Sequence, residues 1–100
     1  MNHMTGFDLT ASVNDVSLTY NDLGSGAIPV IFIHGFPFDK TMWHYQLEEL
    51  RLVYRVIAYD IRGFGKSESG TEAAGMNQYA DDLISFMDAL KIQKAVICGL

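Results

Sequence analysis

The chain has 100 residues, of which 49% are hydrophobic, so we expect one small domain with a real core over residues 1–100. Twelve acidic against seven basic side chains give a formal charge of -5, which excludes the basic surface that nucleic acid or anionic lipid requires. The longest apolar run, residues 27–33, is far shorter than the roughly 20 residues of a membrane-spanning helix. One cysteine and no secretory signal in residues 1–6 favour a reducing, cytoplasmic location with no metal and no cofactor.

The first predicted elements form an antiparallel hairpin followed by a buried strand. Apolar and polar residues alternate over 7–12 and again over 16–20, and Asn14-Asp15 between them favours a turn. Beyond the glycines at 24 and 26, the continuous apolar run at 29–33 is typical of a strand buried on both faces.

Helical spacing appears next, over residues 41–52, with Thr41 as the expected N-cap. The apolar side of this helix is marked by Trp43, Leu47 and Leu50. Residues 53–59 are again apolar and β-branched, which predicts a second buried strand that ends at Asp60. A glycine-rich loop over 61–75 follows this strand.

The second predicted helix has the most regular pattern in the chain. Its apolar residues fall at helical spacing: Tyr79, Leu83, Phe86, Met87 and Leu90. Its polar side carries Asp81, Asp82, Ser85 and Asp88. Residues 95–98 then predict a third buried strand. A hairpin followed by alternating strands and helices indicates an α/β fold, with a mostly parallel sheet and helices on both faces.

A short motif, His34-Gly35-Phe36-Pro37, stands where the first buried strand ends. Open α/β sheets bind their ligands at the carboxyl ends of parallel strands. A glycine lets the backbone turn sharply there, so that the amide of Phe36 can donate to a developing oxyanion. An ordinary strand-to-helix loop with a structural His34 accounts for these four residues equally well.

The glycine-rich loop invites two nucleotide-binding interpretations, and both fail on spacing. A phosphate-binding loop ending at Gly65-Lys66-Ser67 would need glycine at position 60, which is Asp60. A dinucleotide fingerprint would need glycine at position 68, which is Glu68. We therefore expect a structural loop, held by hydrogen bonds and tight glycine turns, that uses Asp60, Arg62, Gly63, Gly65 and Ser67.

Three segments, IFIHGFPFDKTMW, YDIRGFGKS and AVICGL, together resemble successive landmarks of the α/β-hydrolase family. The resemblance extends from about Val16 to the end of the chain. It implies that the loop of His34 supplies one oxyanion-hole amide, that of Phe36, and that a G-x-S-x-G nucleophile elbow begins at Gly99 with Leu100 before the nucleophile. It also implies that the strands ending at residues 34 and 99 are neighbours, which brings both oxyanion donors together.

On this resemblance the complete protein is a serine hydrolase that cleaves a small-molecule ester or related acyl bond, with nucleophile, acid and base after Leu100. An aspartate nucleophile, as in epoxide hydrolases and haloalkane dehalogenases, is the alternative within the fold. A non-catalytic, self-associating fragment is the alternative from another class. Residues 1–100 then contain no catalytic residue: His3 belongs to a tail, His34 to the oxyanion loop, His44 to the first helix and Cys98 to the core.

The final strand, 95–98, would have one bare edge in the isolated chain. Unpaired strand edges recruit partners, so we expect the isolated chain to self-associate or to pair with the missing part of the protein. Phe36, Phe38 and Trp43 are expected either to line one wall of a substrate pocket or to pack in the core.

Overall fold

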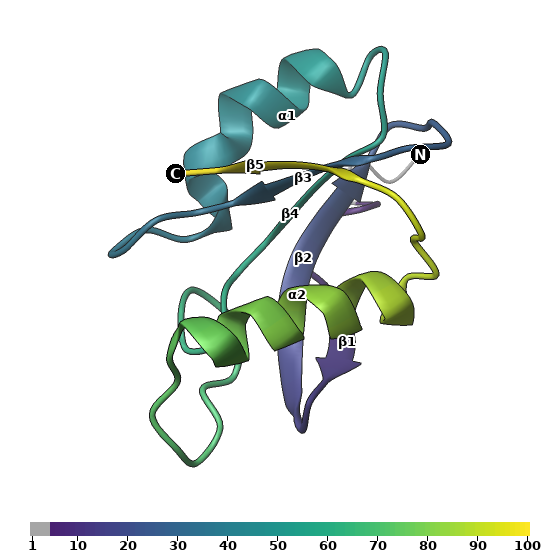
Figure 1. Ribbon diagram of the computed structural model, residues 1–100. Coiled ribbons are helices and arrows are strands. Elements are labelled where there is room, and N and C mark those ends of the chain that lie inside the picture. The colour runs from purple at the N-terminus through teal and green to yellow at the C-terminus, as the bar shows by residue number, and fades with distance from the viewer. Residues whose placement is uncertain (1–4) are drawn as a thin grey trace.

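Residues 5–100 are described by a computed structural model (Figure 1), so His3 lies outside the described residues. The strands, in chain order, are β1 (Leu9–Val13), β2 (Val16–Leu23), β3 (Val30–Ile33), β4 (Val56–Tyr59) and β5 (Val96–Gly99). The helices are α1 (His44–Leu50), which directly follows the 3-10 helix η1 (Lys40–Trp43), and α2 (Met76–Ala89). The five strands form one sheet in the order β1-β2-β4-β3-β5.

The predicted hairpin is confirmed. Val13 of β1 pairs with Val16 of β2, and both residues between them, Asn14 and Asp15, have positive φ values of 47° and 70°. Two consecutive left-handed residues match the twist of an antiparallel hairpin. β2 continues beyond the predicted end at residue 20 because its second half pairs with β4, an interaction that local sequence does not reveal.

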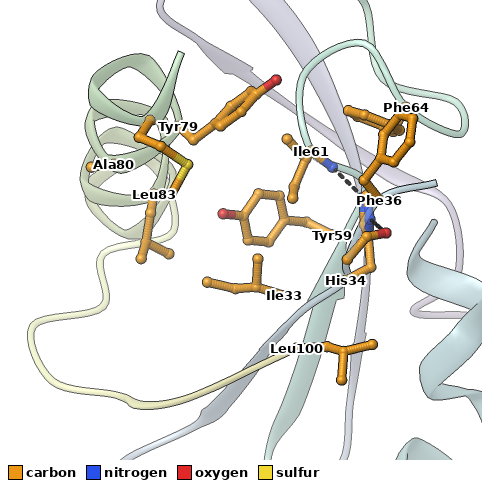
Figure 2. A pocket seen from close by; sticks show the side chains of 12 residues that line it. Ile33, His34, Phe36, Tyr59, Ile61, Phe64, Tyr79, Ala80, Leu83 and Leu100 are labelled. Carbon is orange, nitrogen blue, oxygen red and sulfur yellow. Dashed lines mark hydrogen bonds between the residues drawn. The ribbon is translucent and has the colours of Figure 1, made fainter. Parts of the chain in front are cut away.

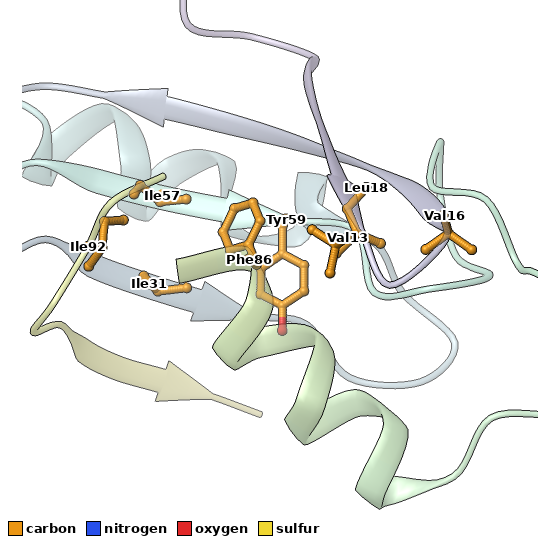
Figure 3. Close-up of a cluster of buried hydrophobic side chains, with 8 residues drawn as sticks. All are labelled: Val13, Val16, Leu18, Ile31, Ile57, Tyr59, Phe86 and Ile92. Atoms are coloured by element: carbon orange, nitrogen blue, oxygen red, sulfur yellow. The ribbon is translucent and has the colours of Figure 1, made fainter. Parts of the chain in front are cut away.

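The rest of the sheet is parallel, with β3 between β4 and β5. Successive residues of a strand point to opposite faces. Ile31 of β3 accordingly packs in one cluster with Phe86 of α2, whereas the next residue, Phe32, packs in another with Leu47 of α1. The predicted arrangement with helices on both faces is confirmed, and Figure 1 shows α1 and α2 on opposite sides of the sheet; Figure 3 shows the cluster on the α2 side.

The third predicted strand, β5, is present but is not buried: Val96 and Ile97 are 56% and 45% exposed, and β5 lies at one edge of the sheet. Two predicted boundaries are also wrong. Thr41 is not the N-cap of the first helix, because the carboxylate of Asp39 accepts its backbone N–H at 2.9 Å and caps η1. A charged oxygen is a stronger acceptor than a hydroxyl. The second buried strand begins at Val56 and not at residue 53, since Val53 lies in the turn after α1 and is 69% exposed. Within residues 5–100, no helix has both the length and the apolar character needed to cross a membrane.

Candidate active site

The carboxyl ends of β3 and β5 lie side by side. Ile33 pairs with Gly99, and the backbone N–H of Leu100 donates to the carbonyl of Ile33 at 3.2 Å. The carbonyl oxygen of Leu100 lies 3.5 Å from the point where a Cβ on Gly35 would stand. The predicted adjacency of the two strands is confirmed, and it places Leu100 against the loop that follows β3.

A hollow of about 430 Å³ opens at this edge. Figure 2 shows α2 on one side of it, the loops that follow β3 and β4 on the other, and Leu100 nearby. Its walls are mostly apolar and include Ile33, Phe36, Tyr59, Phe64, Tyr79 and Leu83. No Asp, Glu, Lys or Arg of the described chain lines it. An apolar wall strengthens any hydrogen bond made to a charge that develops beside it.

Phe36 stands at the rim of this hollow. Its side chain is 83% exposed and makes an edge contact with Phe64, with the ring centroids 5.9 Å apart. The N–H of Phe38 donates to the carbonyl of Gly35 at 2.8 Å and closes the turn. No acceptor in residues 5–100 takes a hydrogen bond from the N–H of Phe36, so this amide has no partner within the described chain. The Phe36–Pro37 peptide bond is cis.

The sequence predicted that the conformational freedom of Gly35 allows the sharp turn after β3, and the structure differs on this point. The φ of Gly35 lies outside the left-handed region, so the turn does not depend on the conformational freedom of glycine. A Cβ at this position would instead lie at ordinary contact distance from Leu100. The sharp change of direction is completed by the hydrogen bond that Gly35 accepts from Phe38.

His34 holds the start of the loop. The side chain is buried, and its Nε2 accepts the backbone N–H of Ile61 at 3.0 Å. This nitrogen therefore carries no proton, and Nδ1 donates to the carbonyl of Gly35 at 3.1 Å. With both ring nitrogens engaged, His34 joins the loops that follow β3 and β4 and is not placed to act as a base.

Asp60 organises the loop after β4. It is 1% exposed, and its carboxylate accepts the backbone N–H groups of Lys40 and Lys66 at 2.7 and 2.9 Å. Its carbonyl accepts the Ser67 hydroxyl at 2.6 Å. Gly65, at φ 51°, passes so close to the carboxylate that a Cβ there would overlap it. The sequence placed these residues in one structural loop, and the contacts show how they close it.

Lys40 is the residue that the sequence did not reveal. It is only 3% exposed, and its Nζ lies 3.1 Å from Asp60 Oδ2 and 2.8 Å from Asp8 Oδ1. Burial alone would lower the pKa of Lys40, but hydrogen bonds to Asp8 and Asp60 outweigh it and raise the pKa. Hydrogen bonds from Lys40, and then from Lys66, lower the pKa of Asp8. A buried carboxylate at Asp60 required some cation, but nothing local identified Lys40.

Arg62 ties the same loop to α2 and to the hairpin. Its Nε and Nη2 bond both carboxylate oxygens of Asp82 at 2.8 and 3.0 Å, and Nη2 also reaches the Asn14 carbonyl at 3.0 Å. Asp82, expected on the exposed side of its helix, is only 2% exposed, because Arg62 and the hairpin turn cover it. Burial would raise the pKa of Asp82, but hydrogen bonds from Arg62, Asn14 and Gln78 outweigh it and lower the pKa.

The other candidates lie away from the hollow. Trp43 packs against Phe32 in the core, with ring centroids 4.9 Å apart, and Phe38 is not among the lining residues, so of the three predicted wall residues only Phe36 lies there. His44 is exposed on α1, and Cys98 is half-buried in β5. In the part of the chain that the structure describes, no three His, Cys, Asp or Glu residues are grouped as metal ligands.

Comparison with known proteins decides the family. A family model described as the alpha/beta hydrolase fold matches residues 28–100. The chain belongs to the α/β-hydrolase family. The solved structure of a thermophilic esterase from Thermogutta terrifontis superposes with a TM-score of 0.83 at 39% identity, over 92% of this chain and 35% of that one.

Two curated relatives of this α/β-hydrolase are named for different activities. An epoxide hydrolase from Caballeronia sordidicola is 37% identical over 108 residues, covering 98% of this chain and 32% of the relative. A bifunctional esterase/perhydrolase from Acinetobacter calcoaceticus is 38% identical over 86 residues, covering 84% and 31%. The chain thus spans about a third of the length of the relatives it matches.

Proposed function

We propose that this chain is the N-terminal part of a serine hydrolase that cleaves a small-molecule ester or a related acyl bond. In this proposal the backbone N–H of Phe36 is one donor of the oxyanion hole. The observation that carries the proposal is the meeting of the β3 and β5 ends, where Leu100 donates to the Ile33 carbonyl. A residue after Leu100 enters the site beside the amide of Phe36. The esterase and the esterase/perhydrolase among the similar proteins support this substrate class.

The chemistry assigned to the chain is electrostatic. When a nucleophile attacks the ester carbonyl, negative charge moves to the carbonyl oxygen, and the Phe36 N–H donates a hydrogen bond to it. The second donor is the amide of the residue after the nucleophile, as the elbow motif requires. The nucleophile, acid and base follow Leu100, so the described residues contribute the donor and the walls and no group that moves a proton.

An aspartate nucleophile is the second candidate, and the epoxide hydrolase relative favours it. An aspartate would attack an epoxide carbon and break its bond to the ring oxygen, which takes a proton from an acid supplied by the rest of the protein. Water would then hydrolyse the resulting alkyl-enzyme ester to a diol and the free aspartate. The His34-Gly35-Phe36-Pro37 loop suits both classes. The residue that follows Leu100 separates them.

Covalent labelling tests the proposal. The complete protein is treated with a fluorophosphonate, and the modified peptide is located by mass spectrometry. We expect one adduct, on a serine directly after Leu100, together with loss of esterase activity. An aspartate at that position, resistance to the probe and opening of a simple epoxide would transfer the assignment to the second candidate. A protein that is neither labelled nor active on esters or epoxides would support a non-catalytic module.

A further inference from the structure

Both ends of the oxyanion loop are anchored to two consecutive residues of one neighbouring loop. At its start, His34 accepts the N–H of Ile61. At its end, the backbone N–H of Lys40 donates to Asp60 Oδ1 at 2.7 Å, and the Lys40 ammonium group donates to Asp60 Oδ2 at 3.1 Å. The segment from Gly35 to Asp39, which carries the Phe36 amide, is therefore held at its start by Ile61 and at its end by Asp60.

The anchor itself is fixed to the sheet. Asp60 directly follows β4, and its own N–H donates to the Thr19 carbonyl of β2 at 2.9 Å. Its Oδ1 accepts a hydrogen bond from the backbone N–H of Lys40. Its Oδ2 accepts hydrogen bonds from the Lys40 ammonium group and from the backbone N–H of Lys66. These hydrogen bonds satisfy both carboxylate oxygens, and the Lys40 ammonium group also lies 2.8 Å from Asp8 Oδ1, so Lys40 is held at both ends of its side chain.

We propose that Lys40 is a positioning residue for the oxyanion donor: its buried ammonium group locks onto Asp60 and thereby sets where the loop presents the Phe36 amide. Lys40 does not line the 430 Å³ hollow, and it borders a separate recess with Asp8 and Lys66. It therefore acts through the loop and touches no reacting atom. The inference rests on the proposed function, because the Phe36 amide matters to catalysis only if it faces an oxyanion.

Loss of this anchor has a distinctive kinetic effect. The oxyanion hydrogen bond strengthens only in the transition state, so a displaced donor lowers kcat and leaves KM nearly unchanged. Misplacement of a catalytic group by about 1 Å costs up to roughly 100-fold in rate. We therefore expect Lys40→Met in the complete protein to lower kcat by roughly 10- to 100-fold, with KM within about two-fold of the parent value.

A matched control separates positioning from general destabilisation. Arg55 and Asp22 form an ion pair, less buried than that of Lys40 with Asp60, at the opposite end of β4, with Nη2 and Oδ2 2.7 Å apart. Arg55→Met removes a cation from that pair without touching the loop, and we expect kcat to stay within about two-fold. Equal losses of kcat in the two variants would overturn the proposal.

Hydrogen exchange provides a readout that does not depend on the reaction. The backbone amides of Phe38 and of residue 40, which are hydrogen-bonded to the Gly35 carbonyl and to Asp60 in the parent protein, should exchange at least roughly ten-fold faster in Lys40→Met, with core amides of β4 unchanged. If the parent protein hydrolyses no ester, the proposed function fails, and unchanged loop exchange separately overturns the role of Lys40. If Lys40→Met does not fold, Lys40→Gln replaces it. The side-chain N–H of glutamine is uncharged and one bond closer to the backbone than Lys40 Nζ, so its contact with Asp60 is weakened. Parental kcat together with parental loop exchange in that variant would contradict the proposal.

Discussion

Replacing Arg62 with methionine keeps the aliphatic stem and removes the cation that faces Asp82. The side chains of Arg62 and Asp82 are 9% and 3% exposed, so the variant leaves the Asp82 carboxylate largely buried without its cation. Breaking a buried ion pair from one side costs about 3–5 kcal/mol. Asn14 and Gln78 still donate to the Asp82 carboxylate, so we expect the lower end, a loss of about 3 kcal/mol in the free energy of unfolding.

Urea unfolding, followed by circular dichroism and by fluorescence of the single tryptophan at fixed protein concentration, measures this loss. With a slope of about 1.5 kcal/mol/M, the midpoint should fall by about 2 M. Arg51→Met breaks an exposed pair with Glu48 and should cost below about 0.5 kcal/mol. The double variant Arg62→Met with Asp82→Leu should recover most of the loss, because no charge is left buried. If Arg62→Met costs no more than Arg51→Met, the reasoning is refuted.

Three further predictions concern pH and the isolated chain. Because the pKa of Asp82 is lowered in the fold, its contribution to stability is present above the ordinary aspartate value of 3.8 and is lost as the pH falls through the lower folded pKa; acid titration of unfolding should show this loss, and a flat profile would contradict it. The isolated 100-residue chain should hydrolyse an activated ester no faster than background; turnover that disappears in Cys98→Ala would revive a cysteine nucleophile. The same chain should self-associate at micromolar concentration through the free edge of β5, where Val96 and Ile97 are 56% and 45% exposed; sedimentation as a compact monomer that unfolds cooperatively would count against it.

Much of the fold could be predicted because hydrophobic periodicity is a local signal. The run at 29–33 indicated a buried strand, and the spacing from Tyr79 to Leu90 indicated a helix. Both are present, as β3 and α2. Boundaries were less accurate where another part of the chain decides them: β2 extends to Leu23 because β4 lies beside it.

For the site, the sequence predicted the loops that form it but not the side-chain pairs that hold those loops in place. The loop of His34 and the end of β5 could be placed together because the family resemblance supplied the strand order. Polar partners far apart in sequence could not be predicted, since the pairs Lys40 with Asp60 and Arg62 with Asp82 each join residues 20 positions apart. Asp82 shows the difficulty: its helical position indicated an exposed carboxylate, whereas tertiary contacts bury it.

The most direct measurement compares Phe36→Pro with Phe36→Leu in the complete protein. Proline deletes the N–H of residue 36, whereas leucine keeps the N–H and removes the aromatic ring. Loss of one oxyanion donor costs roughly 100-fold or more in kcat, so we expect that loss in Phe36→Pro and a change below about ten-fold in Phe36→Leu. A folded Phe36→Pro protein with the activity of Phe36→Leu would show that the Phe36 amide is not the donor.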